Sequence, residues 1–212
     1  MSVEAPLPED DARSRREAEV RSLLADGNVR DAAAAAVELY GGEVLGFLCA
    51  IARDDDLANE AFAVFSEDLL RGLPRFRWDA SLRTWSYALA RNALHRLRRD
   101  PRRRPGNNVP LSSPGAGISA VVEQVRTRTL PFLRTEVKDE LRRLRDALDP
   151  DDHALLVLRI DRKLSWKDIA RAMPGDDDQS VERRAATLRK RFERAKLMLR
   201  ELASSRGLIP TD

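Results

Sequence analysis

Four aromatic residues lie close together beside an arginine-rich segment in the middle of the chain. Phe76, Trp78, Trp85 and Tyr87 fall within twelve residues, and residues 82–104 contain eight arginines and one acid. Aromatic rings offer stacking surfaces to unpaired bases, and arginines neutralise a phosphate backbone, so this composition indicates a nucleic-acid contact. Trp85 also lies on an apolar helical stripe and is expected to be core. For Trp78 and Tyr87, function and packing remain equally open.

A second basic segment lies near the end of the chain. Residues 182–201 contain eight bases and three acids, whereas residues 54–68 contain six acids and no base, so the net charge of +3 hides a strong asymmetry. Two separate basic segments predict two contacts with one polyanion. Arginine outnumbers lysine by 33 to 5 across the chain, so a compositional bias toward arginine is the alternative explanation.

The sequence contains no recognisable pattern of a catalytic or metal site. It has no glycine-rich phosphate loop, no nucleophile elbow and no histidine–carboxylate metal spacing. His95 and His153 lie in different parts of the chain, and Cys49 is the single cysteine. We therefore predict that the protein is not an enzyme and has no metal, cofactor or small-molecule substrate. The acidic start and the lack of an apolar run of about 20 residues predict a cytoplasmic protein without membrane insertion.

Proline, glycine and charge predict an all-α protein with two small helical domains. Residues 1–27 are expected to be a flexible extension with a short helix near residues 17–24. In the first domain, residues 28–100, five consecutive alanines favour helix over residues 31–39, which Gly41 and Gly42 loosen before it resumes at residue 45. Two more apolar stripes predict helices after Asp54–Asp56 and after Ser81, a plausible N-cap. The stripe of the third helix is predicted to be Leu82, Trp85, Leu89, Ala93 and Leu97.

The remaining residues predict a linker and a second domain. Residues 101–130 begin with several prolines and glycines, which is typical of a linker, and residues 131–206 return to helical spacing, followed by a tail at 207–212. The predicted first stripe of this domain is Leu133, Val137, Leu141, Leu144 and Leu148. Asp151 can cap a short helix after Pro150, and Ser165 with Asp168 resembles a capping box. A strict four-three apolar spacing from Val181 to Leu202 predicts a long amphipathic helix, which completes a helix-turn-helix.

Two stretches of the chain resemble region two and region four of the extracytoplasmic-function sigma factors of bacterial RNA polymerase. The first runs through PRFR, DASLRTW and LARNAL to RLRR, and the second through LDPDDHALLVLRIDRKLSWKDIARAM to TLRKRFERAKLMLREL. They cover nearly two thirds of the chain, in the order of the family and with a linker between them. The resemblance implies that the protein binds core RNA polymerase and directs it to promoters.

The resemblance also implies residue roles in promoter recognition. Region two recognises and melts the minus-ten element and captures a flipped base, and region four places a recognition helix in the major groove at the minus-thirty-five element. The matching minus-ten residues are Arg83, Trp85, Tyr87, Arg91, Asn92, His95 and Arg96. The matching minus-thirty-five residues are Thr187, Arg189, Lys190, Arg191 and Arg194.

The expected partners are core polymerase, through the clamp coiled coil of its largest subunit and through its flap, promoter DNA and an anti-sigma factor. The segment that matches the clamp-binding helix supplies the polymerase-binding candidates Asp56, Asn59, Glu60, Phe62, Ala63 and Ser66. The family usually has an acid and a glutamine where this chain has Asn59 and Phe62, and an exposed Phe62 would anchor an interface.

The turn between Met173 and Thr187 is longer here than in the family, and the notable acidic run Asp176–Asp178 lies within it. Either the first turns of the last helix tilt its approach to DNA, or the acidic run repels phosphate and enforces a different angle.

Two alternatives to the sigma-factor interpretation also stay open. One is a helix-turn-helix regulator that acts without core polymerase. The other is a protein that binds polymerase or an anti-sigma factor without reading promoters.

Overall fold

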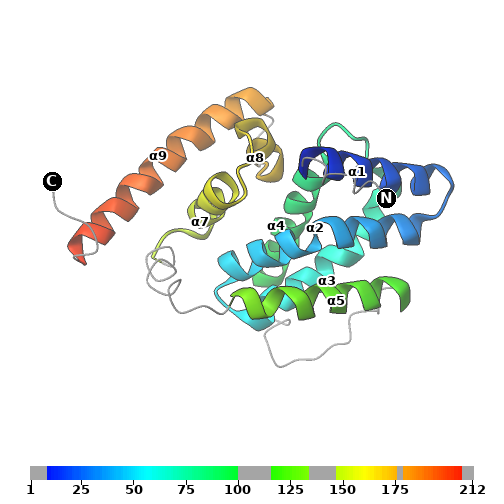
Figure 1. Cartoon of the computed structure of the whole chain (residues 1–212). Helices are drawn as coiled ribbons and strands as arrows, with labels where there is room; N and C mark the ends of the chain where they lie inside the picture. The colour runs from blue at the N-terminus through cyan, green and yellow to red at the C-terminus, as the bar shows by residue number, and fades with distance from the viewer. Residues whose placement is uncertain (1–8, 100–115, 134–146, 176–178, 207–212) are drawn as a thin grey trace, which may run out of the picture.

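The protein is helical throughout the residues that its structure describes. The computed structural model describes residues 9–99, 116–133, 147–175 and 179–206, and every regular element in these ranges is a helix (Figure 1). The predicted all-α class is confirmed. Part of the predicted linker, the predicted tail and the stripe positions Val137, Leu141 and Leu144 lie outside the described residues, as does the acidic run Asp176–Asp178.

The first helix, α1 (Glu9–Ala25), is longer than the short helix expected within a flexible extension. It packs along α2 (Val29–Ala52), where Val20 is fully buried. Tyr40 of α2 donates a hydrogen bond to Glu17 at 2.7 Å, and Arg13 forms an ion pair with Glu43 at 3.1 Å. Residues 9–25 therefore belong to the helical fold rather than to a flexible extension.

Helix α2 runs without interruption through Gly41 and Gly42, so the predicted loosening of the helix there is wrong. Gly41 is needed for close packing: a Cβ atom on it would lie 3.2 Å from Val125 of a later helix and 3.3 Å from Phe62.

Helix α2 is also the only described helix that is long and apolar enough to cross a membrane, and most of its apolar window is buried by neighbouring helices. The packing of α1 and of the later helices α3, α4 and α5 against it therefore accounts for its apolar character.

Helix α3 (Asp55–Gly72), the short η1 (Leu73–Arg75) and α4 (Leu82–Arg99) follow α2. The Asp54 side chain caps α3 by accepting from the Leu57 amide at 2.6 Å, and the predicted cap of α4 by Ser81 is confirmed by a 3.1 Å bond from the Thr84 amide. The buried face of α4 is wider than the predicted stripe and includes Tyr87, Ala90 and Leu94, while Trp85 and Leu89 are only half-buried. The reason is that α4 is covered on two sides, by α2 and α3 and by a later helix, α8.

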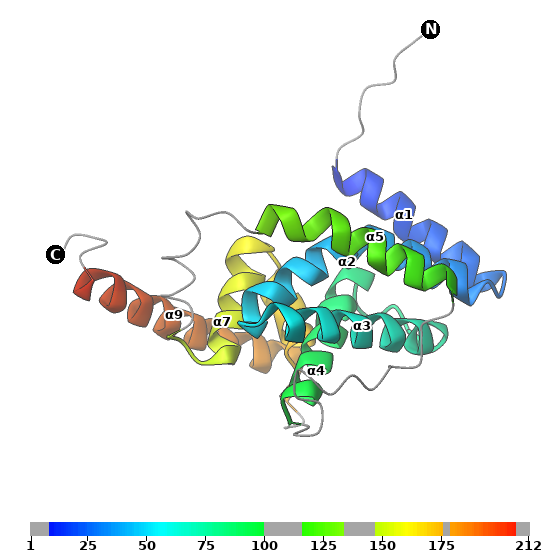
Figure 2. The same cartoon turned by 90° about the horizontal axis from the view of Figure 1, so that it is seen from below.

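Helix α5 (Ala116–Leu133) occupies much of the predicted linker, so the linker assignment of residues 116–130 is wrong. It lies along α2 and α3 (Figure 2). Val122 is buried and Val125 packs against the core, and Arg126 donates to the backbone carbonyl of Asn59 at 2.7 Å. The proline- and glycine-rich composition stops at Gly117, after which apolar residues recur at helical spacing.

The C-terminal helices are α7 (Pro150–Leu156), the π-helical segment η4 (Val157–Asp161), α8 (Trp166–Ala172) and α9 (Val181–Ser205). Asp149, and not the predicted Asp151, caps α7, and Pro150 takes the first helical position, where no amide hydrogen is needed. Ser165 is the N-cap of α8, because the Asp168 amide donates to the Ser165 hydroxyl oxygen at 3.1 Å, and this hydroxyl donates to the Asp168 carboxylate at 2.5 Å. Helix α9 has the predicted start, with Ser180 as its N-cap.

The C-terminal helices pack against α2 and α4 of the first part of the chain. Helix α8 lies against α4, and α7 and α8 lie between α9 and the rest of the molecule (Figure 1). Two arginines donate hydrogen bonds across this contact. Arg53 donates to the backbone carbonyl of Leu148 at 2.6 Å, and Arg83 donates to the backbone carbonyl of Arg162 at 3.1 Å. The apolar core continues across the contact.

Substitution Gly41→Val is expected to lower the free energy of unfolding by about 1–3 kcal/mol, because the added methyl groups enter space already filled by Val125 and Phe62. The measurement is the urea unfolding curve. Gly42→Ala is the control, since a Cβ there meets only Thr129 at 3.5 Å and should raise stability by up to about 1 kcal/mol through helix propensity. Equal stability of Gly41→Val and the natural protein would contradict the packing of α5 on α2.

Candidate nucleic-acid interface

Two predicted minus-ten residues, Arg83 and Tyr87, are held by Glu43 of α2. The Tyr87 hydroxyl donates to Glu43 Oε2 at 3.0 Å, and Arg83 Nε donates to the same oxygen at 2.7 Å. Tyr87 is 1% exposed, and burial is the main cause that raises the pKa of its hydroxyl. The prediction that Tyr87 contacts DNA is wrong for this arrangement, because its ring is buried between α2 and α4.

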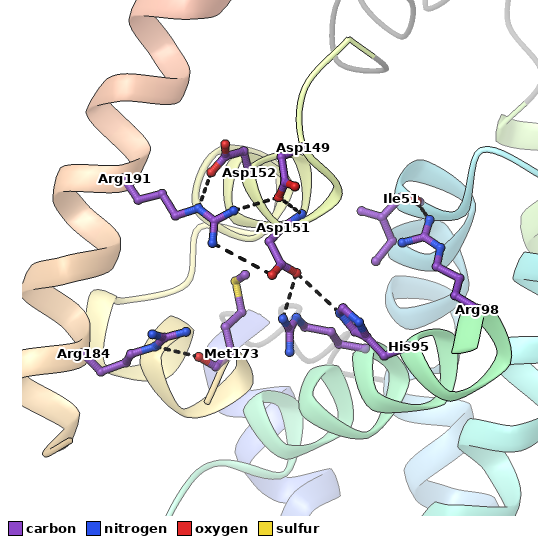
Figure 3. A network of polar contacts seen from close by, with 10 residues as sticks. Ile51, His95, Arg98, Asp149, Asp151, Asp152, Met173, Arg184 and Arg191 are labelled. Carbon is purple, nitrogen blue, oxygen red and sulfur yellow. Dashed lines mark hydrogen bonds and ion pairs between the residues drawn. The ribbon is translucent and has the colours of Figure 1, made fainter. Parts of the chain in front are cut away.

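Arg91 and His95 of α4 both contact Asp151 of α7. His95 Nε2 lies 3.4 Å from Asp151 Oδ1 (Figure 3). Arg91 Nη2 lies 2.8 Å from the same oxygen. The hydrogen bond from His95, followed by the bond and charge of Arg91, holds the pKa of Asp151 well below its usual range although burial opposes this. The Arg91 side chain is only 11% exposed.

Arg191 of α9 reaches the same acidic turn from the other side. It donates to Asp149 at 2.7 Å and to Asp152, and its Nη1 lies 3.9 Å from Asp151 (Figure 3). The prediction that Arg191 is a minus-thirty-five contact is therefore wrong for this arrangement, because its guanidinium faces α7. Asp151 stands between cations from both basic segments.

The remaining basic face of α4 is open. Asn92 is exposed and forms no side-chain hydrogen bond with the described residues, and Arg96 is exposed and pairs with Asp68. A cavity of about 630 Å³ between α3 and α4 is lined by Asn92, His95 and Arg96 together with Arg71, Arg75 and Arg99. Sequence reasoning did not select Arg71 and Arg75, although their spacing of four residues across the end of α3 is a signal that they share a face.

A second cavity, of about 430 Å³, adjoins this face and is lined by aromatic rings. Phe76 stacks on Trp85 with ring centroids 4.5 Å apart and 17° between the planes. The Trp85 ring packs so closely on Gly72 that a Cβ there would lie 2.9 Å from it. Trp85 is thus half-buried against the core, as expected, and also lines a cavity bordered by Arg75, Arg77 and Arg171.

Trp78 has a strained backbone beside this cavity. Its φ of 60° is unusual for a bulky residue. Its ring packs on Phe76, with centroids 4.8 Å apart, and the guanidinium of Arg21 lies 4.1 Å from its centre. Helix α1 therefore supports the loop that presents Phe76, and Trp78 has a packing role.

Helix α9 presents most of its predicted residues to solvent. Thr187, Arg189, Lys190 and Arg194 are exposed. The Thr187 hydroxyl donates to the Arg183 carbonyl, and Arg189 lies 5.5 Å from the centre of the Trp166 ring. Apart from Arg191, this face is available to an anionic partner.

The polymerase-binding candidates on α3 divide into exposed and buried residues. Asp56 is exposed, and Asn59, Glu60 and Ala63 are partly exposed. Phe62 and Ser66 are fully buried, so the predictions that place them in an interface are wrong. Phe62 stacks on Phe65 under α2, with centroids 5.6 Å apart, and the Ser66 hydroxyl donates to the Phe62 carbonyl at 2.9 Å.

The described residues include no group of three or more His, Cys, Asp or Glu side chains arranged to hold a metal ion. Comparison of the chain with known protein families, curated proteins and solved structures found no match. The site is therefore defined by its own geometry: an arginine-rich face on α4, an aromatic cavity beside it and a basic face on α9.

Substitution Asp151→Asn is expected to lower the free energy of unfolding by about 1–3 kcal/mol at neutral pH, because it leaves Arg91 without its charged partner. The folded-state pKa of Asp151 is depressed, so its contribution is complete above the ordinary carboxyl pKa of about 4 and is lost as the pH falls below that value. Urea unfolding at several pH values should therefore show a difference between the two proteins that shrinks in acid.

The control for this experiment is Glu193→Gln, which removes an exposed ion pair with Lys196 and should change stability by less than about 0.5 kcal/mol. A difference between Asp151→Asn and the natural protein that stays constant from neutral pH to acid would contradict a charged contact at Asp151.

Proposed function

We propose that this protein is a sigma factor that binds core RNA polymerase and directs promoter recognition, DNA melting and transcription initiation. Helices α1–α5 form the polymerase- and minus-ten-binding module, and α7–α9 form the minus-thirty-five-binding module. The single observation that carries the proposal is the open basic face of α4 with the aromatic cavity of Phe76 and Trp85 directly beside it. The resemblance to region two and region four supports the same assignment.

This combination suits melted DNA better than an intact duplex. Arg71, Arg75, Arg96 and Arg99 can neutralise backbone phosphates, and Asn92 can donate and accept hydrogen bonds at a base edge. Stacking on an aromatic platform contributes about 1–3 kcal/mol per base, which helps to hold an unpaired base outside the duplex. A cavity of about 430 Å³ bordered by stacked rings and arginines fits such a base.

Helix α9 supplies the second contact. Its first turns extend from Ser180, so Thr187 lies in the second turn and Arg194 lies two turns further along. The exposed Arg189, Lys190 and Arg194 are suited to phosphates or base edges of the minus-thirty-five element. Asp56 and the partly exposed Asn59, Glu60 and Ala63 remain the candidates for the polymerase clamp.

The arrangement of the helices has a consequence for this mechanism. Arg91 and His95 are paired with Asp151 of the second module, and Arg171 of α8 borders the aromatic cavity. Promoter DNA that uses these groups has to replace the contacts with α7 and α8. The two promoter elements lie apart along the DNA. We therefore expect the two modules to separate when the protein binds them together with core polymerase.

Addition of the purified protein to core polymerase is expected to give run-off transcription from specific promoter fragments. Asn92→Ala should reduce open-complex formation at least tenfold, because this side chain is exposed, forms no hydrogen bond with the described residues and can contact DNA. Its thermal stability and its capture of core polymerase should stay unchanged. Equal loss of polymerase binding and open-complex formation would contradict the role given to Asn92.

The run-off experiment also separates the alternatives. Tight sequence-specific binding to duplex DNA without core polymerase would favour a helix-turn-helix regulator. Polymerase or anti-sigma binding without promoter-specific transcription would favour an interaction protein. Failure to associate with core polymerase would overturn the sigma-factor proposal.

Arg194→Gln is expected to reduce the salt dependence of promoter binding by the holoenzyme, lowering the slope of log affinity against log salt by about 1. Arg191→Gln is the matched comparison on the same helix. It should change the slope less, because Asp149 and Asp152 already neutralise Arg191. The measurement is a salt titration of binding, and a larger effect of Arg191→Gln would show that α9 leaves α7 on DNA.

A further inference from the structure

A separate cavity of about 620 Å³ lies where α4 meets α7 and the start of α9. Its polar lining comes from Arg91, Asn92, His95 and Arg99 of α4, Asp151 of α7 and Arg184 of α9. It is therefore made jointly by the two halves of the chain, unlike the cavity between α3 and α4.

The charges around this cavity are unbalanced. Among the described residues that line it, Asp151 is the one acid, and its carboxylate already contacts Arg91 and His95. Arg99 and Arg184 form no ion pair with the described residues, so two further guanidinium groups face one shared carboxylate. In the described part of the lining, three arginines against one acid favour an anion with more than one negative charge.

Hydrogen-bonding capacity is also left over in the lining. Arg91 Nε is buried without a partner. Arg184 donates through Nε to the Met173 carbonyl at 3.2 Å, which fixes the side chain and leaves its terminal nitrogens available (Figure 3). Asn92 adds a side-chain amide that forms no hydrogen bond with the described residues. These groups are planar donors that match phosphate oxygens.

We propose that this cavity is a binding site for a small phosphate-bearing polyanion of the nucleoside polyphosphate class, held by Arg91 and Arg99 from α4 and by Arg184 from α9. The volume exceeds that of a single phosphate and lies within the range of small-molecule sites. Because the ligand joins α4 to α9, it binds the packed arrangement of the helices and stabilises it.

A consequence of this site rests on the proposed function. Asn92 and Arg99 also line the face assigned to promoter DNA, so one residue set serves two anions. The small polyanion and melted DNA then exclude each other. The ligand would keep the protein from promoters by holding the helices together.

The first test is calorimetric titration of the full chain with inorganic tripolyphosphate, guanosine triphosphate and adenosine triphosphate. We expect saturable binding of one ligand per chain, with a gain for the nucleotides over tripolyphosphate if the nucleoside also occupies the cavity. Arg184→Gln and Arg99→Gln should each weaken binding about tenfold, which corresponds to one lost charge-assisted hydrogen bond. Arg194→Gln, an exposed arginine on α9 outside the cavity, should bind as the natural protein does.

Arg99 lies at the last position of α4 and is exposed, so Arg99→Gln keeps the test valid even if Arg184→Gln unfolds the chain. The proposed site would be contradicted if ligand binding did not saturate at millimolar concentration. It would also be contradicted if Arg194→Gln lost as much ligand affinity as the cavity variants, because binding would then reflect general charge attraction. A second arm adds single-stranded promoter DNA to the complex. Binding that is lost in the cavity variants but not displaced by DNA would keep the site and contradict the DNA face instead.

Discussion

The contact of Asp151 with both basic segments is the interaction on which the arrangement of this molecule depends. Its carboxylate accepts from Arg91 and lies near His95 on α4, while Arg191 approaches from α9. Arginine-rich helices repel one another, and α4 and α9 come together because the acidic turn of α7 stands between them. Without that turn, the apolar contact of α8 with α4 would have to overcome this repulsion alone.

A second constraint acts inside the first half of the chain. Helix α2 packs with α1, α3, α4 and α5, and such crowding requires a surface with little side-chain bulk on one side. Gly41 provides this surface, with Val125 and Phe62 close to the missing Cβ. The same packing buries Phe62, which removes it from the surface of α3. Phe62, which the sequence suggested as an anchor for a partner, is therefore a core residue covered by α2.

The features that could be predicted from the sequence are those that depend on residues close together in the chain. Caps and stripes are local, so Ser81, Ser165 and Ser180 start their helices as expected and α9 has its predicted apolar face. The burial of Tyr87 depends on Glu43, which is 44 residues away. The role of Arg191 depends on acids 39 and 42 residues away. Helical periodicity describes contacts a few residues apart, so it does not predict partners at these sequence separations.

The same limit explains why residue type was a better guide than residue role. Arginine and aromatic side chains do gather in the segment where the cavities and the open face lie, but arginine suits carboxylates as well as phosphates. Arg91 and Arg191 lie on carboxylates here, whereas Asn92 and Arg194 remain exposed. A carboxylate held between guanidinium groups occupies the place that a phosphate would take. Any anion that binds this face therefore has to displace Asp151 or bind beside it, and the choice between these two outcomes determines whether the helices separate.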